Sequence, residues 1–173
     1  MKKETGGSVV LIGFMGSGKS TMGIRLSYRL QYALEDTDKL IECRAGKTIS
    51  EIFASDGEEA FRQMETEMLE KLTENRGLRI YSVGGGTPVR AVNRPLLKKL
   101  GTVVYLRTRP ETIYERLKGD TSRPLLQGED PLDTIRSLMA EREAAYTEAA
   151  DVILDVDGMT ADQVVESIVM CVR

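Results

Sequence analysis

Residues 13–20 read Gly13-Phe14-Met15-Gly16-Ser17-Gly18-Lys19-Ser20 and are the strongest structural signal in this chain. They place glycine, glycine, lysine and serine at the spacing of a phosphate-binding loop. Glycines let the backbone wrap around a phosphate with its N–H groups pointing inward, and a helix that begins near Lys19 adds the positive end of its dipole. In such a loop the lysine reaches the β- and γ-phosphates of a nucleotide, and the hydroxyl at the position of Ser20 binds Mg²⁺. The alternative interpretation is an ordinary glycine-rich turn between a strand and a helix.

The sequence on either side of this loop has the pattern that a phosphate-binding loop requires. Residues 8–12 predict a buried strand before it, and residues 19–30 predict a helix after it. We expect further strands at 33–36, 78–83, 102–106 and 152–154, and helices at 49–54, 58–74, 95–100, 110–117, 133–149 and 161–172. This alternation predicts an α/β fold, with a parallel sheet between two layers of helices. Ligands bind beyond the carboxyl ends of the strands in such sheets, so we expect the site in the loops that follow them.

Composition limits the classes of function. With 173 residues the chain suits one domain, and a net charge of −3 argues against a protein that binds nucleic acid through a basic face. The apolar runs are far shorter than the roughly 20 residues that span a bilayer, and we find no signal peptide. Two distant cysteines favour a reducing compartment, and the absence of histidine leaves carboxylates, lysine and arginine for chemistry. We expect a cytoplasmic monomer with no nucleic-acid or membrane partner.

Two acidic residues follow the second predicted strand, in Asp36-Thr37-Asp38. Side chains two residues apart on an extended segment point the same way, so both carboxylates can face one site. One of them can support Mg²⁺ while the other orients or deprotonates a hydroxyl. The alternative is an Asx turn that caps a helix at Lys39-Leu40-Ile41, because Asp is common before an apolar helix.

Three glycines, Gly84, Gly85 and Gly86, end the third predicted strand. They allow the backbone to approach a ligand closely and to offer N–H groups to an anion. A flexible turn is the alternative interpretation.

Four arginines are candidates for binding anions, each with a plainer alternative. Arg62 has Glu65 at i+3 and can form an ordinary helical ion pair. Arg116 lies near the end of a helix, where a cation suits the dipole. Arg123 falls in the irregular segment 118–131, whose length is typical of a functional lid or a disordered loop, and it can be a solvated loop charge. Arg142 can lie on a solvated helix face.

Taken together, these motifs resemble those of shikimate kinases, and the resemblance extends from about Val9 to Arg173. It is carried, in this order, by residues 13–21, Asp36-Thr37-Asp38, Ile52-Phe53 with Gly57-Glu58-Glu59-Ala60-Phe61-Arg62, Gly84-Gly85-Gly86-Thr87-Pro88, Arg123-Pro124-Leu125-Leu126, and Arg142 with Tyr146 at i+4. The family implies a P-loop NTPase fold like that of nucleoside monophosphate kinases, with a five-stranded parallel sheet. It also implies a substrate-binding insertion at about 36–63 and a mobile lid at about 118–131.

The resemblance further implies ATP, Mg²⁺ and shikimate as ligands, and a step of chorismate and aromatic amino acid biosynthesis. It assigns the nucleotide to Gly16, Ser17, Gly18, Lys19, Ser20, Thr21, Arg116 and Arg123, with Ser20 and Asp36 on the metal. It assigns shikimate to Asp38, Arg62, Gly84, Gly85, Gly86 and Arg142, with Phe53 and Phe61 as walls of the pocket. Catalysis falls to Lys19, Asp36, Asp38 and Arg123, and Glu65 steers Arg62.

Parts of the sequence depart from this pattern or leave other functions open. Residues 155–159, where relatives also touch adenine, are acidic and show no match. Phe53 and Phe61 can simply belong to the core.

A gluconate kinase shares the fold but typically carries a histidine near the acidic pair, and a nucleoside monophosphate kinase would bring a phosphate against those acids. A nucleotide-binding module without turnover is the alternative from another class.

Overall fold

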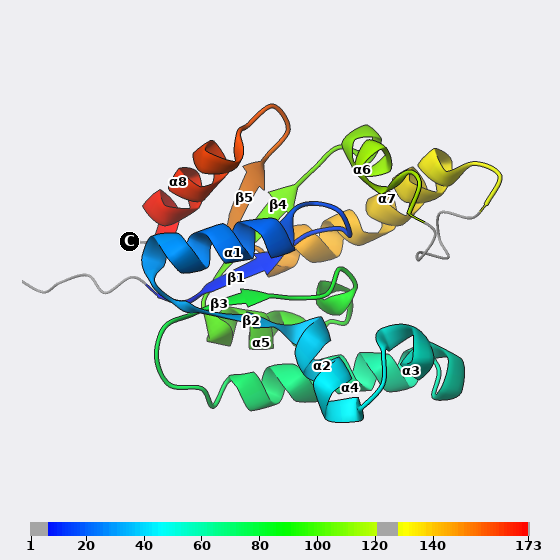
Figure 1. The fold of residues 1–173 in the computed structure, drawn as a ribbon, viewed down its shortest axis with the longest axis horizontal. Coiled ribbons are helices and arrows are strands. Elements are labelled where there is room, and N and C mark those ends of the chain that lie inside the picture. Colours follow the sequence, from blue (N-terminus) through cyan, green and yellow to red (C-terminus); the bar gives the residue numbers. More distant parts are fainter. Residues whose placement is uncertain (1–6, 121–127, 173) are drawn as a thin grey trace, which may run out of the picture.

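A parallel sheet runs through the middle of the computed structural model, which describes residues 7–120 and 128–172. Its strands are β1 (Val9–Ile12), β2 (Ala33–Asp36), β3 (Arg79–Ser82), β4 (Thr102–Arg107) and β5 (Val152–Asp155). They lie in the order β2-β3-β1-β4-β5, and every neighbouring pair is parallel (Figure 1). The five-stranded sheet and its order confirm the predicted fold class.

Helices form a layer on each face of the sheet. One layer contains α1 (Lys19–Leu30) and α8 (Ala161–Val172). The other contains α4 (Glu58–Leu72), α5 (Asn93–Leu100) and α7 (Pro131–Ala149) (Figure 1). Three shorter elements lie outside these layers: α2 (Thr37–Ala45) and α3 (Ile49–Ser55) pack on α4, and α6 (Pro110–Leu117) packs on α7. A 3₁₀ turn, η1 (Thr87–Val89), follows the three glycines.

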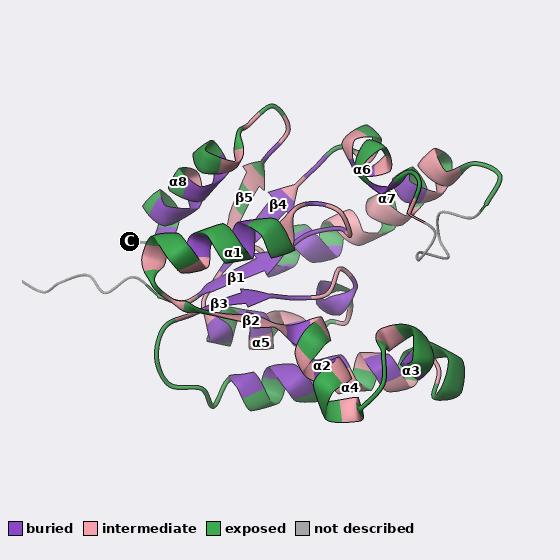
Figure 2. Cartoon of the chain, in the orientation of Figure 1, coloured by how far each residue is buried: buried purple, intermediate pink, exposed green. Residues whose placement is uncertain are grey.

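The central strand is buried on both faces, which explains why its sequence is continuously apolar. Val10 and Ile12 belong to the hydrophobic cluster under α4, α5 and α7, while Val9 and Leu11 belong to the cluster under α1 and α8. All four side chains are fully buried (Figure 2). Two cores thus hold β1 rigidly, and β1 carries the phosphate-binding loop at its end.

The structure corrects one premise about the acidic pair. Asp36 and Asp38 do not share an extended segment, because α2 begins at Thr37 directly after β2. Asp36 is the N-cap of α2, and its Oδ1 accepts a hydrogen bond from the backbone N–H of Lys39 at 3.2 Å. Asp38 therefore lies in the first helical turn. The capping that the alternative interpretation predicted is present, whatever else Asp36 does.

The predicted helices and strands otherwise agree with the structure within a few residues at their ends. The helix expected from Pro95 begins at Asn93 instead. Within the described part of the chain, no helix has the length and apolar character needed to cross a membrane.

Candidate active site

The phosphate-binding loop occupies the turn between β1 and α1. Gly16 and Gly18 have φ angles of 76° and 99°, in the left-handed region that glycine adopts without strain. Ser17 is buried, and its backbone N–H donates to the carbonyl of Phe14 at 3.1 Å, a hydrogen bond within the loop itself. Ser20 and Thr21 lie exposed in the first turn of α1. The loop has the shape and the glycine positions that the sequence predicts for a phosphate cradle.

The amino end of α1 is suited to an anion. Its N-cap Gly18 provides no side-chain hydrogen bond, and the first turn contains no acidic residue. By contrast, α2, α3 and α7 are each capped by an Asp or Thr side chain. The first N–H groups of α1 are thus left for a ligand such as a phosphate.

Two cations lie against the loop. The Nζ of Lys19 donates to the carbonyls of Gly13 and Phe14 at 2.7 and 3.0 Å, so the side chain folds back over the loop. Arg116, near the end of α6, donates from Nη1 to the carbonyl of Gly16 at 2.9 Å. Arg116 therefore reaches the loop as well as suiting its helix end. Arg123, the fourth arginine singled out from the sequence, lies outside the described residues.

Asp38 points a carboxylate oxygen into the site. Its Oδ1 is buried and has no hydrogen-bond partner within residues 7–120 and 128–172. Burial, followed by the nearby charges of Glu65 and Asp36, raises the pKa of this carboxyl to about 6, and Lys19 offsets part of the effect. A buried oxygen without a donor is costly, so this position favours a ligand that brings a hydroxyl.

The three glycines are required by close neighbours rather than by unusual φ angles. A Cβ at position 84 would lie 2.8 Å from Oδ1 of Asp38. A Cβ at position 86 would lie 2.7 Å from Cζ of Arg62, and one at position 85 would lie 3.3 Å from the backbone nitrogen of Met15. The turn is ordered by backbone hydrogen bonds from Thr87 to Gly84 and from Val89 to Gly86, both at 3.1 Å. It is therefore a packed junction between the acid, the arginine and the phosphate loop, not a flexible turn.

Arg62 lies half-buried on α4 and is held by acids. Its Nη1 forms an ion pair of 2.5 Å with Oε1 of Glu65, and its Nη2 lies 3.5 Å from Glu58. Glu65 is buried, and its other oxygen accepts a short hydrogen bond from the hydroxyl of Thr87. The helical ion pair that the sequence allowed is present, and it fixes the guanidinium beside Gly86.

Arg142 reaches the glycine turn from α7. It is half-buried on α7, with its guanidinium 5.6 Å from the ring centroid of Phe14. A Cβ at Gly85 would lie 3.7 Å from its Nη1. Tyr146, one turn later and fully buried, donates its hydroxyl hydrogen to the carbonyl of Gly85 at 2.6 Å. The alternative of a solvated helix face is thus wrong for Arg142.

The two phenylalanines differ in burial. Phe61 is buried in the core, whereas Phe53 is 37% exposed. Their rings are tilted against each other with centroids 5.0 Å apart, and the Arg62 guanidinium lies 5.4 Å from the Phe61 ring. The core interpretation therefore holds for Phe61 only, because Phe53 packs on the Phe61 ring but is partly exposed to solvent.

Thr87 and Tyr146 also contact this group of residues, although neither was assigned a role of its own from the sequence. Thr87 directly follows the glycines, and Tyr146 lies one helical turn from Arg142. Their positions beside known motif residues were the only indication in the sequence that they contact the site. Their hydrogen bonds to Glu65 and Gly85 join segments far apart in the chain, which spacing alone cannot indicate.

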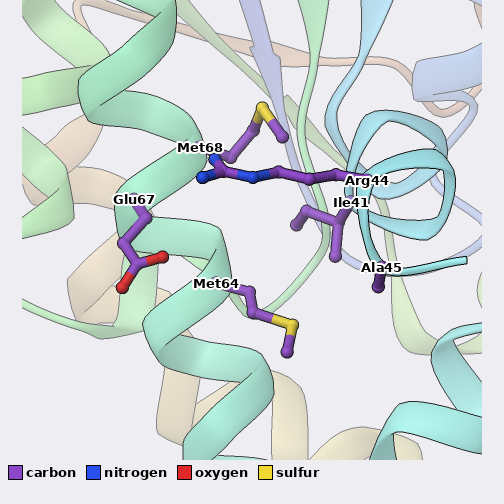
Figure 3. Close-up of a pocket in the computed structure, with 6 residues that line it drawn as sticks. All are labelled: Ile41, Arg44, Ala45, Met64, Glu67 and Met68. Atoms are coloured by element: carbon purple, nitrogen blue, oxygen red, sulfur yellow. The ribbon is translucent and has the colours of Figure 1, made fainter.

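A pocket of about 210 Å³ lies elsewhere, between α2 and α4 (Figure 3). It is lined by Ile41, Arg44, Ala45, Met64, Glu67 and Met68. None of the predicted site residues lines it, so it is separate from the glycine turn.

The residues present fit a magnesium ion that is carried largely by phosphates. Within the described residues, no cluster of three or more acidic, histidine or cysteine side chains could form a protein cage for a metal. Ser20 and Asp36 offer hydroxyl and carboxylate oxygens, and Oδ1 of Asp36 is already used by the helix cap. Mg²⁺ usually takes one or two protein oxygens and completes its shell with phosphates and water.

The strand order and the phosphate loop after the central strand define the class of protein: an ATP-dependent phosphotransferase with a P-loop kinase fold. A family model described as shikimate kinase matches residues 15–173. The chain belongs to the shikimate kinase family.

Individual relatives agree with this assignment. The shikimate kinase of Geobacter sulfurreducens is 45% identical over 168 residues, covering 97% of this chain and 92% of the relative. That of Neisseria meningitidis serogroup C is 45% identical over 149 residues, or 86% of this chain and 87% of the relative. The structure of shikimate kinase from Acinetobacter baumannii in complex with shikimate matches with a TM-score of 0.89 and 38% identity, covering 97% of this chain and 93% of that one.

Proposed function

We propose that the chain transfers the γ-phosphoryl group of ATP to the 3-hydroxyl of shikimate, giving shikimate 3-phosphate and ADP. The observation that carries this proposal is the glycine turn, where each glycine meets a different part of the site. Gly84 adjoins Asp38, Gly85 adjoins Arg142 and the phosphate loop, and Gly86 adjoins Arg62. A carboxylated ligand that also bears hydroxyls matches two arginines and a carboxylate without a partner.

The two arginines bind the carboxylate of shikimate. A guanidinium is a planar fork that can bond both oxygens of a carboxylate, and two of them fix its orientation. Arg62 is aimed by Glu65 on α4, and Arg142 is placed over Phe14 on α7. The exposed ring of Phe53 and the buried ring of Phe61 wall the apolar side of the substrate ring.

Asp38 receives the proton of the attacking hydroxyl. The hydroxyl oxygen forms a bond to the γ-phosphorus, the bond from that phosphorus to the β–γ bridging oxygen breaks, and ADP leaves. The buried Oδ1 without a donor and a pKa of about 6 favour Asp38 over the helix-capping Asp36 for this role. Lys19 moves from the loop carbonyls onto the transferring phosphoryl group and stabilises its charge.

The nucleotide binds with its phosphates on residues 16–21 and its adenine against Arg116, whose guanidinium stacks on the base. Ser20 and Asp36 would hold Mg²⁺, which when bound offsets the charge of the β- and γ-phosphates.

Arg123 acts as an arginine finger in a lid of about residues 118–131, and residues 36–63 form the substrate-binding insertion. The protein acts in the cytoplasm as a monomer, without nucleic-acid or membrane partners, in this proposal. Size-exclusion chromatography can test whether it is a monomer.

The test is ADP release from ATP and Mg²⁺ in a coupled assay, with shikimate, gluconate, AMP or no acceptor. Turnover with shikimate alone is the expected result. Turnover with gluconate or AMP would overturn the substrate assignment while leaving the phosphate site intact. ATP binding without turnover on any acceptor would favour a non-catalytic module.

A further inference from the structure

Behind the glycine turn lies a group of buried polar side chains whose hydrogen bonds the reaction does not use. Thr66 on α4, Asn93 at the start of α5 and Thr87 in η1 are 6%, 1% and 1% exposed. The hydroxyl of Thr66 donates to Oδ1 of Asn93 at 2.7 Å, and Nδ2 of Asn93 donates to the carbonyl of Thr87 at 2.9 Å. One asparagine amide thus joins three elements.

This group continues directly to the substrate arginine. The hydroxyl of Thr87 donates to Oε2 of Glu65, and Oε1 of Glu65 pairs with Nη1 of Arg62 at 2.5 Å. The chain of contacts is Thr66, Asn93, Thr87, Glu65 and Arg62. It begins and ends on α4, and it passes through the turn that carries Gly86.

The geometry of the Glu65 carboxylate depends on where Thr87 is held. Glu65 lies fully inside the protein, and Arg62 and Thr87 each bond one of its oxygens. If η1 shifts, Thr87 moves away from Glu65, and the carboxylate can rotate with the guanidinium that it holds. Asn93 prevents this because its amide binds the Thr87 backbone at one end and α4 at the other.

We propose that Thr66 and Asn93 are positioning residues for shikimate binding, acting through Thr87 and Glu65 on the orientation of Arg62. The proposal rests on the proposed function of Arg62 as a carboxylate ligand. A buried hydrogen bond that only stabilised the fold would change the free energy of unfolding without selecting one substrate over the other. A positioning role affects the substrate with the carboxylate and leaves ATP unaffected.

The experiment compares Thr66→Val, which removes the hydroxyl at nearly constant volume, with Thr66→Ser, which retains it. We expect Thr66→Val to raise KM for shikimate by about tenfold, the effect of leaving one buried polar group unpaired, with KM for ATP unchanged. Thr66→Ser should restore most of the loss. Thr73→Val is the matched control, because Thr73 is exposed at the C-cap of α4 and its hydroxyl donates to the carbonyl of Glu70, away from Asn93 and Arg62.

A double-mutant cycle with Arg62→Ala then tests whether Thr66 acts on shikimate binding through Arg62. If Thr66 acts through Arg62, Thr66→Val adds nothing to KM for shikimate in the Arg62→Ala background. Additive effects, or equal increases in KM for both substrates, would overturn the positioning role while leaving Arg62 as a ligand. An unchanged KM for shikimate in the Arg62→Ala enzyme would instead contradict the proposed role of Arg62 as a carboxylate ligand. The inference about Thr66 and Asn93 would then be wrong as well.

Discussion

The raised pKa of Asp38 should make the free energy of unfolding of the ligand-free protein depend on pH. The Asp38 carboxyl has a pKa of about 6 in the folded chain against an ordinary value of 3.8, chiefly because of burial. The folded state therefore binds the proton more tightly than the unfolded state. The resulting stability is fully present below pH 3.8 and is lost as the pH rises through 6.

Asp38→Asn should remove this loss. Without nucleotide or metal, we expect the variant to be more stable than the parent by about 3 kcal/mol at pH 8, and the difference to vanish near pH 3. Urea unfolding followed by circular dichroism at a series of pH values measures it. Glu141→Gln, on the exposed side of α7, is the control for removing a surface carboxylate. A stability difference that did not vary with pH would show that Asp38 is not strained.

Arg142 and Arg136 show that the sequence does not reveal which arginine of a helix faces the glycine turn and which faces solvent. Both are arginines of α7, but Arg136 is exposed and pairs with Glu111, whereas Arg142 is half-buried over Phe14. Sequence spacing favours neither, since the difference depends on which side of α7 faces the glycine turn. Only the family motif, with Tyr146 four residues on, singles out Arg142.

Arg142→Ala should raise KM for shikimate by about 30-fold or more, because the substrate carboxylate loses a charged partner at a partly desolvated position. KM for ATP should change little. Arg136→Ala is the matched control on the same helix, and its surface ion pair contributes little to any of these quantities. Steady-state kinetics with each substrate varied in turn provides the comparison. An unchanged KM for shikimate would show that Arg142 does not bind the substrate carboxylate.

At the level of elements, the amino end of α2 combines a capping role with a proposed metal role in Asp36. The two roles can be separated because asparagine caps a helix about as well as aspartate but lacks its charge. We expect Asp36→Asn to keep the parent's stability while the Mg²⁺ concentration for half-maximal rate rises. Asp36→Ala should show the same kinetic defect and also lose about 1 kcal/mol of stability.

Thermal unfolding and a magnesium titration of the coupled assay distinguish these outcomes. A magnesium dependence like that of the parent in Asp36→Asn would leave Asp36 with its cap alone. Asp130, which caps α7 through the backbone N–H of Asp133, is the control position for the same pair of substitutions.

Elements with strong apolar patterns were predictable, and weaker ones were placed by tertiary contacts. β1 and residues 103–106 of β4 are continuous apolar runs because both faces are covered. β2, with the sequence Ala-Leu-Glu-Asp, has poor strand propensity but pairs with β3 along its length, and Glu35 lies 3.3 Å from Arg79 of that strand. The sequence did not predict that α2 begins at Thr37, because the spacing of Asp36 and Asp38 was also compatible with one extended segment.

At the level of the whole molecule, the strand order assembles the site. Placing β1 between β3 and β4 brings the phosphate loop beside the glycine turn, and α7 then carries Arg142 across to it. The sequence predicted these components and the edge of the sheet where they meet. The network through Asn93 was not predictable, because its partners Thr66 and Thr87 are joined by packing of α4, α5 and η1, with no pattern in the sequence.

Because the proposed shikimate ligands come from α2, α4, the glycine turn and α7, binding of shikimate should stabilise the entire fold. At about 100 times its dissociation constant a ligand adds about 2.7 kcal/mol, which for a chain of this size raises Tm by roughly 5–10 °C. We expect this shift in differential scanning calorimetry with shikimate, and a much smaller one with its uncharged methyl ester at the same concentration. The Arg142→Ala variant should respond to the two compounds more nearly alike, since the discrimination depends on the carboxylate. An equal shift by acid and ester in the parent protein would place the carboxylate outside the arginine pair and require a different orientation of the substrate.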